Sequence, residues 1–136
     1  MITAKIFAME EIHELDLLKR LFRGHPEYQF DSRLDLSDDG YYRDTLPPDY
    51  DLYWMHLGGV EWEALRVIKE AQPWSRIVLR ESIRDSSASR ERLAGEGYVL
   101  AHGADAIIGH KDGNDPAIIL RTLSRFGIKL NPLQDS

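Results

Sequence analysis

The seven residues from Asp51 to Leu57 read DLYWMHL, and all of them except the aspartate and His56 are apolar. A strand with one face in water alternates polar and apolar side chains, whereas a strand covered on both faces, as in a parallel sheet, is apolar nearly throughout. Ile2–Met9 and Arg76–Arg80 have a similar character. These three stretches therefore predict central strands of a parallel sheet.

Helices are predicted between these strands. Apolar residues recur there every three or four positions, which is the spacing of one helix face. Gly24 and Pro26 stop the first helix, and Asp115-Pro116 starts the last one, with the aspartate as N-cap and the proline as first helical residue. The predicted helices are Ile12–Phe22, a turn or two within Tyr41–Thr45, Val60–Ala71, Ser87–Leu100 and Pro116–Phe126.

Two further strands complete the pattern. Tyr28–Leu36 alternates polar and apolar residues as a half-exposed strand does, and Ala106–Ile108 is short and apolar. Strands that alternate with helices over short connections predict an α/β fold with a parallel sheet between two helical layers, a three-layer αβα sandwich. No interdomain linker interrupts the chain. We therefore expect a single domain over residues 1–130 and a frayed C-terminal tail over residues 131–136.

The composition excludes several classes of function. Without cysteine, the chain can have no disulfide, no thiolate metal site and no cysteine nucleophile. It has 17 basic and 23 acidic residues, a net charge of −6, and no basic stripe along the sequence, which argues against nucleic-acid binding. Neither a signal peptide nor an apolar run long enough to cross a membrane is present. We expect a cytoplasmic protein that binds neither nucleic acid nor membrane.

Polar residues follow the predicted strands at the points where they end. In a parallel α/β sheet these ends meet at the carboxyl edge, where functional groups gather. Two adjacent carboxylates, an imidazole and cations at one crevice could bind a divalent metal, held by the two glutamates, or an oxyanion. Alternatively, the glutamates are solvated residues in the first turn of a helix, where negative charge is favoured. The candidate residues are Glu10, Glu11, His56, Arg80, His110 and Lys111.

Four segments resemble a known family. Lys5–Glu11 is a strand followed by an acidic pair, Asp51–Leu57 and Ile77–Arg80 stand as the third and fourth strands, and Gly103–Ile108 matches a glycine-alanine-aspartate start to the fifth. From Lys5 to Phe126 the chain resembles a receiver (CheY-like) domain of bacterial two-component signalling. The resemblance implies a flavodoxin-like fold with a five-stranded parallel sheet in the order 2-1-3-4-5.

The departures from that family concern its chemistry. His56 stands where receivers have the phosphoacceptor aspartate, and Arg80 where they have a threonine or serine that contacts the phosphoryl group. His110 aligns with the family's lysine, and Lys111 follows one residue late. An aspartyl phosphate needs the carboxylate nucleophile and the hydroxyl, both of which are missing here. The chain thus resembles a degenerate pseudo-receiver, in which a buried His56 forms an internal salt bridge or hydrogen bond with the glutamates.

Three functions are compatible with this sequence. The first is a phosphorylation-independent, non-enzymatic module that binds other proteins in signalling or regulation and needs no cofactor. The second is a metal-dependent enzyme or metal-binding protein that uses Glu10, Glu11 and His56 with His110 or Lys111. The third keeps the flavodoxin-like fold and binds a small anion through Arg80 and Lys111.

The first hypothesis also predicts where a partner binds. Receivers present a face made by the fourth helix, fifth strand and fifth helix, which corresponds to Ser87–Phe126 here. Gly95 and Gly97 weaken the predicted helix in this stretch by about 1 kcal/mol each. Packing must therefore hold that helix, either against the sheet of a monomer or against a second molecule. We expect a protein partner or a homodimer at this face.

Overall fold

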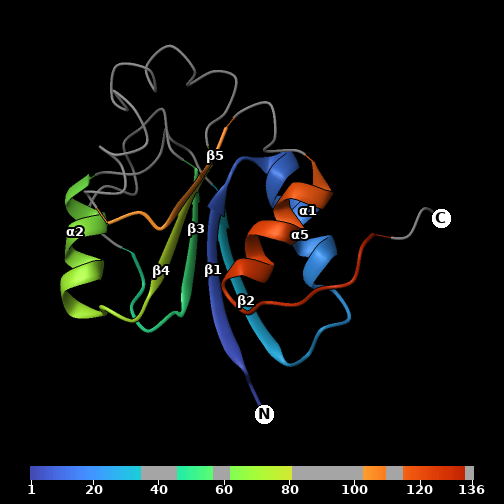
Figure 1. The fold of residues 1–136 in the computed structure, drawn as a ribbon, viewed down its shortest axis with the longest axis horizontal. Helices are drawn as coiled ribbons and strands as arrows, with labels where there is room; N and C mark the ends of the chain where they lie inside the picture. Colours follow the sequence, from blue (N-terminus) through green and yellow to red (C-terminus); the bar gives the residue numbers. More distant parts are fainter. Residues whose placement is uncertain (35–45, 57–61, 81–102, 110–114, 134–136) are drawn as a thin grey trace.

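The computed structural model describes residues 1–34, 46–56, 62–80, 103–109 and 115–133. They contain a five-stranded parallel sheet in the order β2-β1-β3-β4-β5 (Figure 1). This confirms the flavodoxin-like α/β fold with the strand order 2-1-3-4-5. The strands are β1 (Ala4–Glu10), β2 (Tyr28–Leu34), β3 (Leu52–His56), β4 (Arg76–Arg80) and β5 (Ala106–Ile108), and the helices are α1 (Ile12–Phe22), α2 (Trp62–Ala71) and α5 (Pro116–Arg125).

Helices cover both faces of the sheet, as predicted. α1 and α5 lie on one face and α2 lies on the other (Figure 1). Successive residues of β3 point to opposite faces, so Trp54 belongs to the core beneath α1 and α5, whereas Tyr53 belongs to the core beneath α2. Every residue of β3 is buried. The nearly continuous apolar character of DLYWMHL therefore reflects a strand covered on both sides.

The first strand is displaced from its predicted position. Its ladder with β2 begins at the pair Ala4 and Tyr28, and Ile2 precedes it with an exposed fraction of 48%. At the other end Glu10 is still paired, with Leu34. Glu10 is thus the last residue of the strand rather than the first residue after it, and this position buries its side chain.

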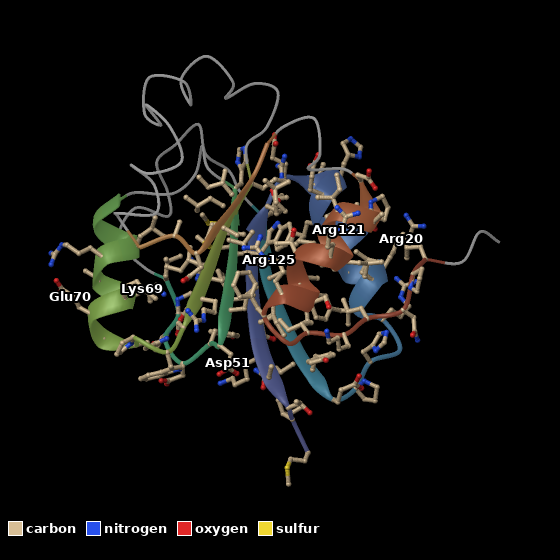
Figure 2. The ribbon with its side chains drawn as sticks, in the orientation of Figure 1. Arg20, Asp51, Lys69, Glu70, Arg121 and Arg125 are labelled. Atoms are coloured by element: carbon tan, nitrogen blue, oxygen red, sulfur yellow. The ribbon has the colours of Figure 1, made fainter. Side chains whose placement is uncertain are left out.

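Asp51 joins three strands at the amino-terminal edge of the sheet (Figure 2). Its Oδ2 accepts a hydrogen bond from the backbone N–H of Lys5 at 2.8 Å, and its own N–H donates to the Lys5 carbonyl at 2.8 Å. Its carbonyl accepts from the N–H of Arg76 at 2.9 Å. These bonds secure the register of β1, β3 and β4, and the register decides which side chains share a face at the opposite edge.

The C-terminal segment is held against the sheet layer. Asp115 caps α5 by accepting a hydrogen bond from the Ala117 N–H at 2.9 Å, and Pro116 is the first helical residue, as predicted. After the helix, Gly127 adopts a φ of +84°, and Ile128 is buried. The Asn131 N–H then donates to a ring nitrogen of His25 at 3.2 Å. Asn131, the first residue of the segment expected to fray, is therefore held at His25 in the connection that follows α1.

Some predicted features lie outside the described residues. They are the short helix within Tyr41–Thr45, the helix over Ser87–Leu100 with its two glycines, and the candidate site residues His110 and Lys111. In the part of the chain that the structure describes, no helix is both long and apolar enough to span a bilayer.

Candidate functional site

Three of the strand-end residues point to the same face of the sheet. Glu10 ends β1, His56 ends β3 and Arg80 ends β4, and the last two are direct neighbours in the β3–β4 ladder. Each lies an even number of residues from a side chain in the core beneath α1 and α5, such as Ala8, Trp54 or Val78. Their exposed fractions are 0%, 1% and 2%, respectively. The carboxyl edge of the sheet thus holds a buried polar cluster.

The centre of this cluster is a bidentate ion pair between Glu10 and Arg80. The Nε of Arg80 donates to Oε2 of Glu10, and its Nη2 donates to Oε1 at 2.7 Å. Trp54 donates its indole N–H to Oε2 at 2.9 Å, and the backbone N–H of Glu11 donates to Oε1 at 3.2 Å. Four N–H donors therefore occupy the two oxygens of Glu10. Since a protonated carboxyl group would find no acceptor here, the geometry requires a carboxylate.

Two further carboxylates approach the same guanidinium from α1. Glu11, in the N-cap position, accepts from Nη2 of Arg80 at 3.0 Å, and Oε2 of Glu14 in the first turn lies 3.9 Å from that nitrogen. Oε1 of Glu11 also lies 3.4 Å from Nε2 of His56. Arg80 is therefore the cation shared by three carboxylates. We call Glu10, Glu11, Glu14, His56, Arg80 and Trp54 the Arg80 cluster.

The environment shifts the pKa values at the centre of the Arg80 cluster. Burial raises the pKa of Glu10 above its ordinary value, and the hydrogen bonds and charge of Arg80 limit that rise. Burial alone would lower the pKa of Arg80, but the hydrogen bonds and charge of Glu10, followed by those of Glu11 and Glu14, raise it above the ordinary value. The guanidinium consequently keeps its charge at any pH at which the protein is folded.

A second polar network lies near the amino-terminal edge. Tyr50 donates its hydroxyl hydrogen to Oδ2 of Asp31 at 2.6 Å, and Ser75 donates to the Tyr50 carbonyl at 2.7 Å. Burial, followed by the hydrogen bond and charge of Asp31, raises the pKa of Tyr50 to about 12. The hydrogen bond from Tyr50, followed by that from Gln29, lowers the pKa of Asp31. This network anchors β2 to the residues before β3 and is structural.

The chain was compared with known proteins. No protein-family model matches it, and no curated protein matches it in sequence. Among solved structures, the BeF3-activated receiver domain of DrrB matches with a TM-score of 0.57 and 18% identity, over 93% of this chain and 97% of that chain. The chain has the receiver fold.

Other solved structures with the receiver fold agree. A LuxR-family two-component response regulator from Aurantimonas matches with a TM-score of 0.58 and 20% identity, over 94% of this chain and 88% of that one. RcsB dimers bound to DNA match with a TM-score of 0.54 and 10% identity, over 95% of this chain and 64% of that one. At these identities the likeness establishes the architecture, whereas the chemistry depends on the side chains of this chain.

In this receiver fold, the structure brings together four of the six candidate residues. Glu10, Glu11, His56 and Arg80 form contacts with one another, while His110 and Lys111 lie outside the described residues. The alternative of two solvated first-turn glutamates is wrong, because Glu10 is a fully buried strand residue and Glu11 holds Arg80.

Two members of the cluster were not predicted. Trp54 lies two residues before His56 and so shares its face, and Glu14 lies one turn after Glu11 on α1. The two-residue spacing along a strand and the three-residue spacing along a helix both predict a shared face, so the sequence could have indicated both residues.

The cluster does not favour the metal hypothesis. Within the described residues, no three histidine, aspartate or glutamate side chains are arranged to hold a metal ion. The oxygens of Glu10, one of the two proposed ligands, already accept four N–H donors. An anion at Arg80 meets a similar obstacle, because this guanidinium is 2% exposed and lies among three carboxylates.

Proposed function

We propose that this chain is a phosphorylation-independent receiver-like module that acts by binding another protein in a signalling or regulatory system. It works in the cytoplasm, needs no cofactor and catalyses no reaction. The observation that carries the proposal is the bidentate pair of Glu10 and Arg80 at the carboxyl edge of the sheet. A protein cation here neutralises the acidic residues that, by the resemblance, a divalent metal would neutralise in a phosphorylated receiver.

The other groups at the edge support the same proposal. By the resemblance, His56 takes the place of the phosphoacceptor, and its Nε2 lies 3.4 Å from a carboxylate oxygen of Glu11. The imidazole is 1% exposed, so a phosphodonor in solution has no access to it in this conformation. A histidine at the position of the phosphoacceptor carboxylate and the internal ion pair of Glu10 with Arg80 both favour a pseudo-receiver.

The proposed partner site is the face over Ser87–Phe126, used either by another protein or by a second copy of this chain. The described part of this face comprises β5 and α5. RcsB is bound to DNA in the structure compared above, but this chain spans 64% of the length of that protein. With a net charge of −6, this chain is proposed to bind protein and to contact neither DNA nor membrane.

The proposal is tested with small phosphodonors. The chain is incubated with acetyl phosphate or beryllofluoride and Mg²⁺, alongside a phosphorylatable receiver as positive control, and followed by intact mass spectrometry and tryptophan fluorescence. We expect no mass increase and no spectral change under conditions in which the control is modified. Stoichiometric phosphorylation of any aspartate, or of His56, would refute phosphorylation independence.

The binding half of the proposal needs its own experiment. Partners are captured from native lysate with the tagged chain, once with acetyl phosphate and Mg²⁺ and once with EDTA. We expect the same partner in equal yield under both conditions. A partner recovered only with the phosphodonor would contradict the proposal.

A further inference from the structure

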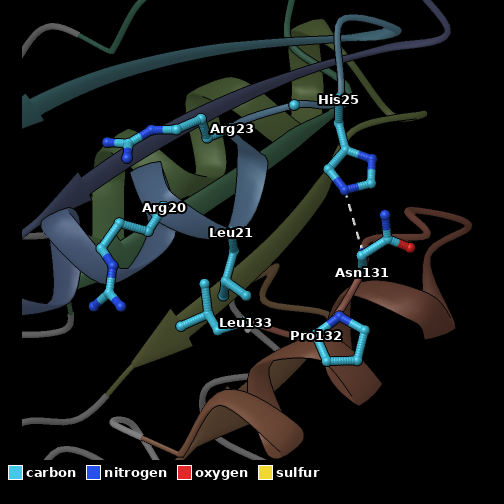
Figure 3. Close-up of a pocket in the computed structure, with 8 residues that line it drawn as sticks. Arg20, Leu21, Arg23, His25, Asn131, Pro132 and Leu133 are labelled. Atoms are coloured by element: carbon cyan, nitrogen blue, oxygen red, sulfur yellow. Dashed lines mark hydrogen bonds between the residues drawn. The ribbon is translucent and has the colours of Figure 1, made fainter. Parts of the chain in front are cut away.

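A cleft lies between the end of α1 and the chain that follows α5. Its volume is about 380 Å³, and Figure 3 shows the side chains around it. Arg20, Leu21 and Arg23 form one wall, and Pro132 and Leu133 form the other. The apolar side chains of Leu21 and Leu133 lie next to each other, and the side chains of Arg20 and Arg23 extend to one side of them (Figure 3). The cleft thus combines two guanidinium groups with an apolar floor.

Hydrogen bonds hold the two walls in place. The N–H of Asn131 donates to Nε2 of His25 at 3.2 Å, so this nitrogen is the acceptor and Nδ1 carries the hydrogen that faces Glu27, at 3.2 Å. The N–H of Lys129 donates to the Tyr28 hydroxyl at 2.9 Å. Leu133 packs against the core beneath α1 and α5. The cleft is therefore formed before any ligand arrives.

The charge around the cleft is opposite to that of the whole chain. Arg20 and Arg23 are exposed, and within the described residues neither forms an ion pair. From residue 116 to residue 133 the chain carries three basic residues, Arg121, Arg125 and Lys129, and no acidic one. Arg20, Arg121 and Arg125 lie in the same helical layer (Figure 2). The lining of the cleft itself carries two arginines and no acidic residue, although the chain has a net charge of −6, and this complements an acidic segment.

The composition of the cleft favours a protein segment over a small metabolite. Small-ligand sites enclose most of the ligand and orient it with a few converging buried polar groups. Here the arginines that offer the charge are exposed at the margin, above a buried leucine. Exposed arginines around an apolar centre are typical of protein–protein interfaces.

We propose that this cleft binds an acidic segment of a protein partner, with a carboxylate on Arg20 and Arg23 and an adjacent apolar side chain against Leu21 and Leu133. The inference rests on the proposed function and adds to it a second contact, outside the face over Ser87–Phe126, for a partner that carries an acidic segment. It also separates binding from the Arg80 cluster. Glu11 of that cluster is the N-cap of α1, and the helix ends at the cleft, so the two sites are separated by the length of α1, roughly 16 Å.

The test uses the full chain and two acetylated peptides, one of alternating glutamate and leucine and one with glutamine in place of glutamate. Binding is followed by ¹⁵N NMR titration, in which the arginine side-chain Nε–H signals report the contact directly. We expect saturable shifts at Arg20, Arg23 and Leu133 with the glutamate peptide and at least about tenfold weaker binding of the glutamine peptide. Equal binding of the two peptides, or shifts centred elsewhere, would overturn the proposal.

Two double variants separate the cleft from general charge. Arg20→Gln with Arg23→Gln removes the proposed contacts, whereas Arg121→Gln with Arg125→Gln removes the same charge from α5, outside the cleft lining. We expect about tenfold weaker binding in the first and less than about threefold in the second. Equal losses of peptide affinity in the two double variants would show that the peptide responds to general positive charge, and would refute binding in the cleft. All four arginines are exposed, and thermal melts check that both variants fold.

Two further arms distinguish the remaining sources of failure. Titration with inorganic phosphate should produce no saturable shifts at millimolar concentration. If phosphate bound and displaced the peptide, the cleft would be a site for a small anion, and the proposed protein segment would be refuted. The peptide titration is repeated after incubation with acetyl phosphate and Mg²⁺, where unchanged affinity is expected. Phosphorylation of the chain would refute the proposed function even if the cleft still bound peptide, whereas loss of peptide binding alone refutes only the cleft.

Discussion

Replacement of Arg80 by methionine should destabilise the protein strongly. Glu10 is 0% exposed, and its carboxylate accepts two of its four hydrogen bonds from Arg80. Arg80→Met therefore leaves this buried carboxylate without its cation. Removal of one partner of a buried ion pair costs about 3–5 kcal/mol, because the other charge is left without compensation. A domain of this size has a free energy of unfolding of roughly 5–15 kcal/mol, so the loss is a large fraction of the total.

The assay is urea unfolding followed by circular dichroism, with a matched variant on the same strand. Arg76 is the first residue of β4, and its side chain is 56% exposed. Its Nη1 lies 3.4 Å from Oδ1 of Asp105. Arg76→Met removes an equal charge from the surface and should cost less than about 1 kcal/mol. A loss for Arg80→Met as small as that for Arg76→Met would refute the view that the cluster holds the crevice together.

The pH dependence of the Arg80 variant tests the same reasoning. Burial already raises the pKa of Glu10, and loss of the opposing charge of Arg80 raises it further. An acid whose folded-state pKa lies above its unfolded value contributes stability below the unfolded value, and this is lost as pH rises through the folded one. Arg80→Met should therefore be less destabilising at pH 5 than at pH 8. If Arg80→Met lowered the free energy of unfolding by the same amount at both pH values, Glu10 would not be left charged and buried in the variant.

Two further predictions concern other parts of the fold. Because the pKa of Tyr50 is raised to about 12, the stability that its neutral hydroxyl contributes is complete below the ordinary tyrosine pKa and should be lost as pH rises through about 12. Burial raises the pKa of Tyr53 as well, so ultraviolet titration of Tyr50→Phe should show one late tyrosine fewer than the unchanged chain. Asp115→Ala removes the N-cap of α5 and should cost about 1 kcal/mol in urea unfolding, whereas Asp115→Asn should retain most of the stability.

Much of the fold could be predicted because its signals are local. A strand covered on both faces needs apolar residues at every position, so DLYWMHL identifies a central strand without its neighbours. Asp115-Pro116 identifies a helix start because the cap and the fixed φ act within one turn. Polar residues at strand ends likewise predicted that Glu10, Glu11, His56 and Arg80 would meet.

The buried ion pair that Glu10 forms with Arg80 could not be predicted, because it depends on the register of the strands and on the residue at which β1 ends. Glu10 and Arg80 are 70 residues apart in the chain, and their pairing requires that both end their strands on the same face. A strand that ended one residue earlier, at Met9 as the sequence pattern predicted, would have left Glu10 at the start of a solvated helix. Only the ladder with β2, which extends to Leu34, buries it beneath the guanidinium.

The cationic cleft depended on tertiary structure in the same way. Sequence alone determined an acidic chain without a basic stripe and placed residues 131–136 in a frayed tail. The parallel fold returns the chain after α5 to the end of α1, where Asn131 meets His25 across 106 residues and Leu133 reaches the core. Local periodicity determines which residues form helices and strands, whereas the charges that face one another are decided by how those elements pack, because Coulomb and hydrogen-bond energies depend on distances in space rather than along the chain.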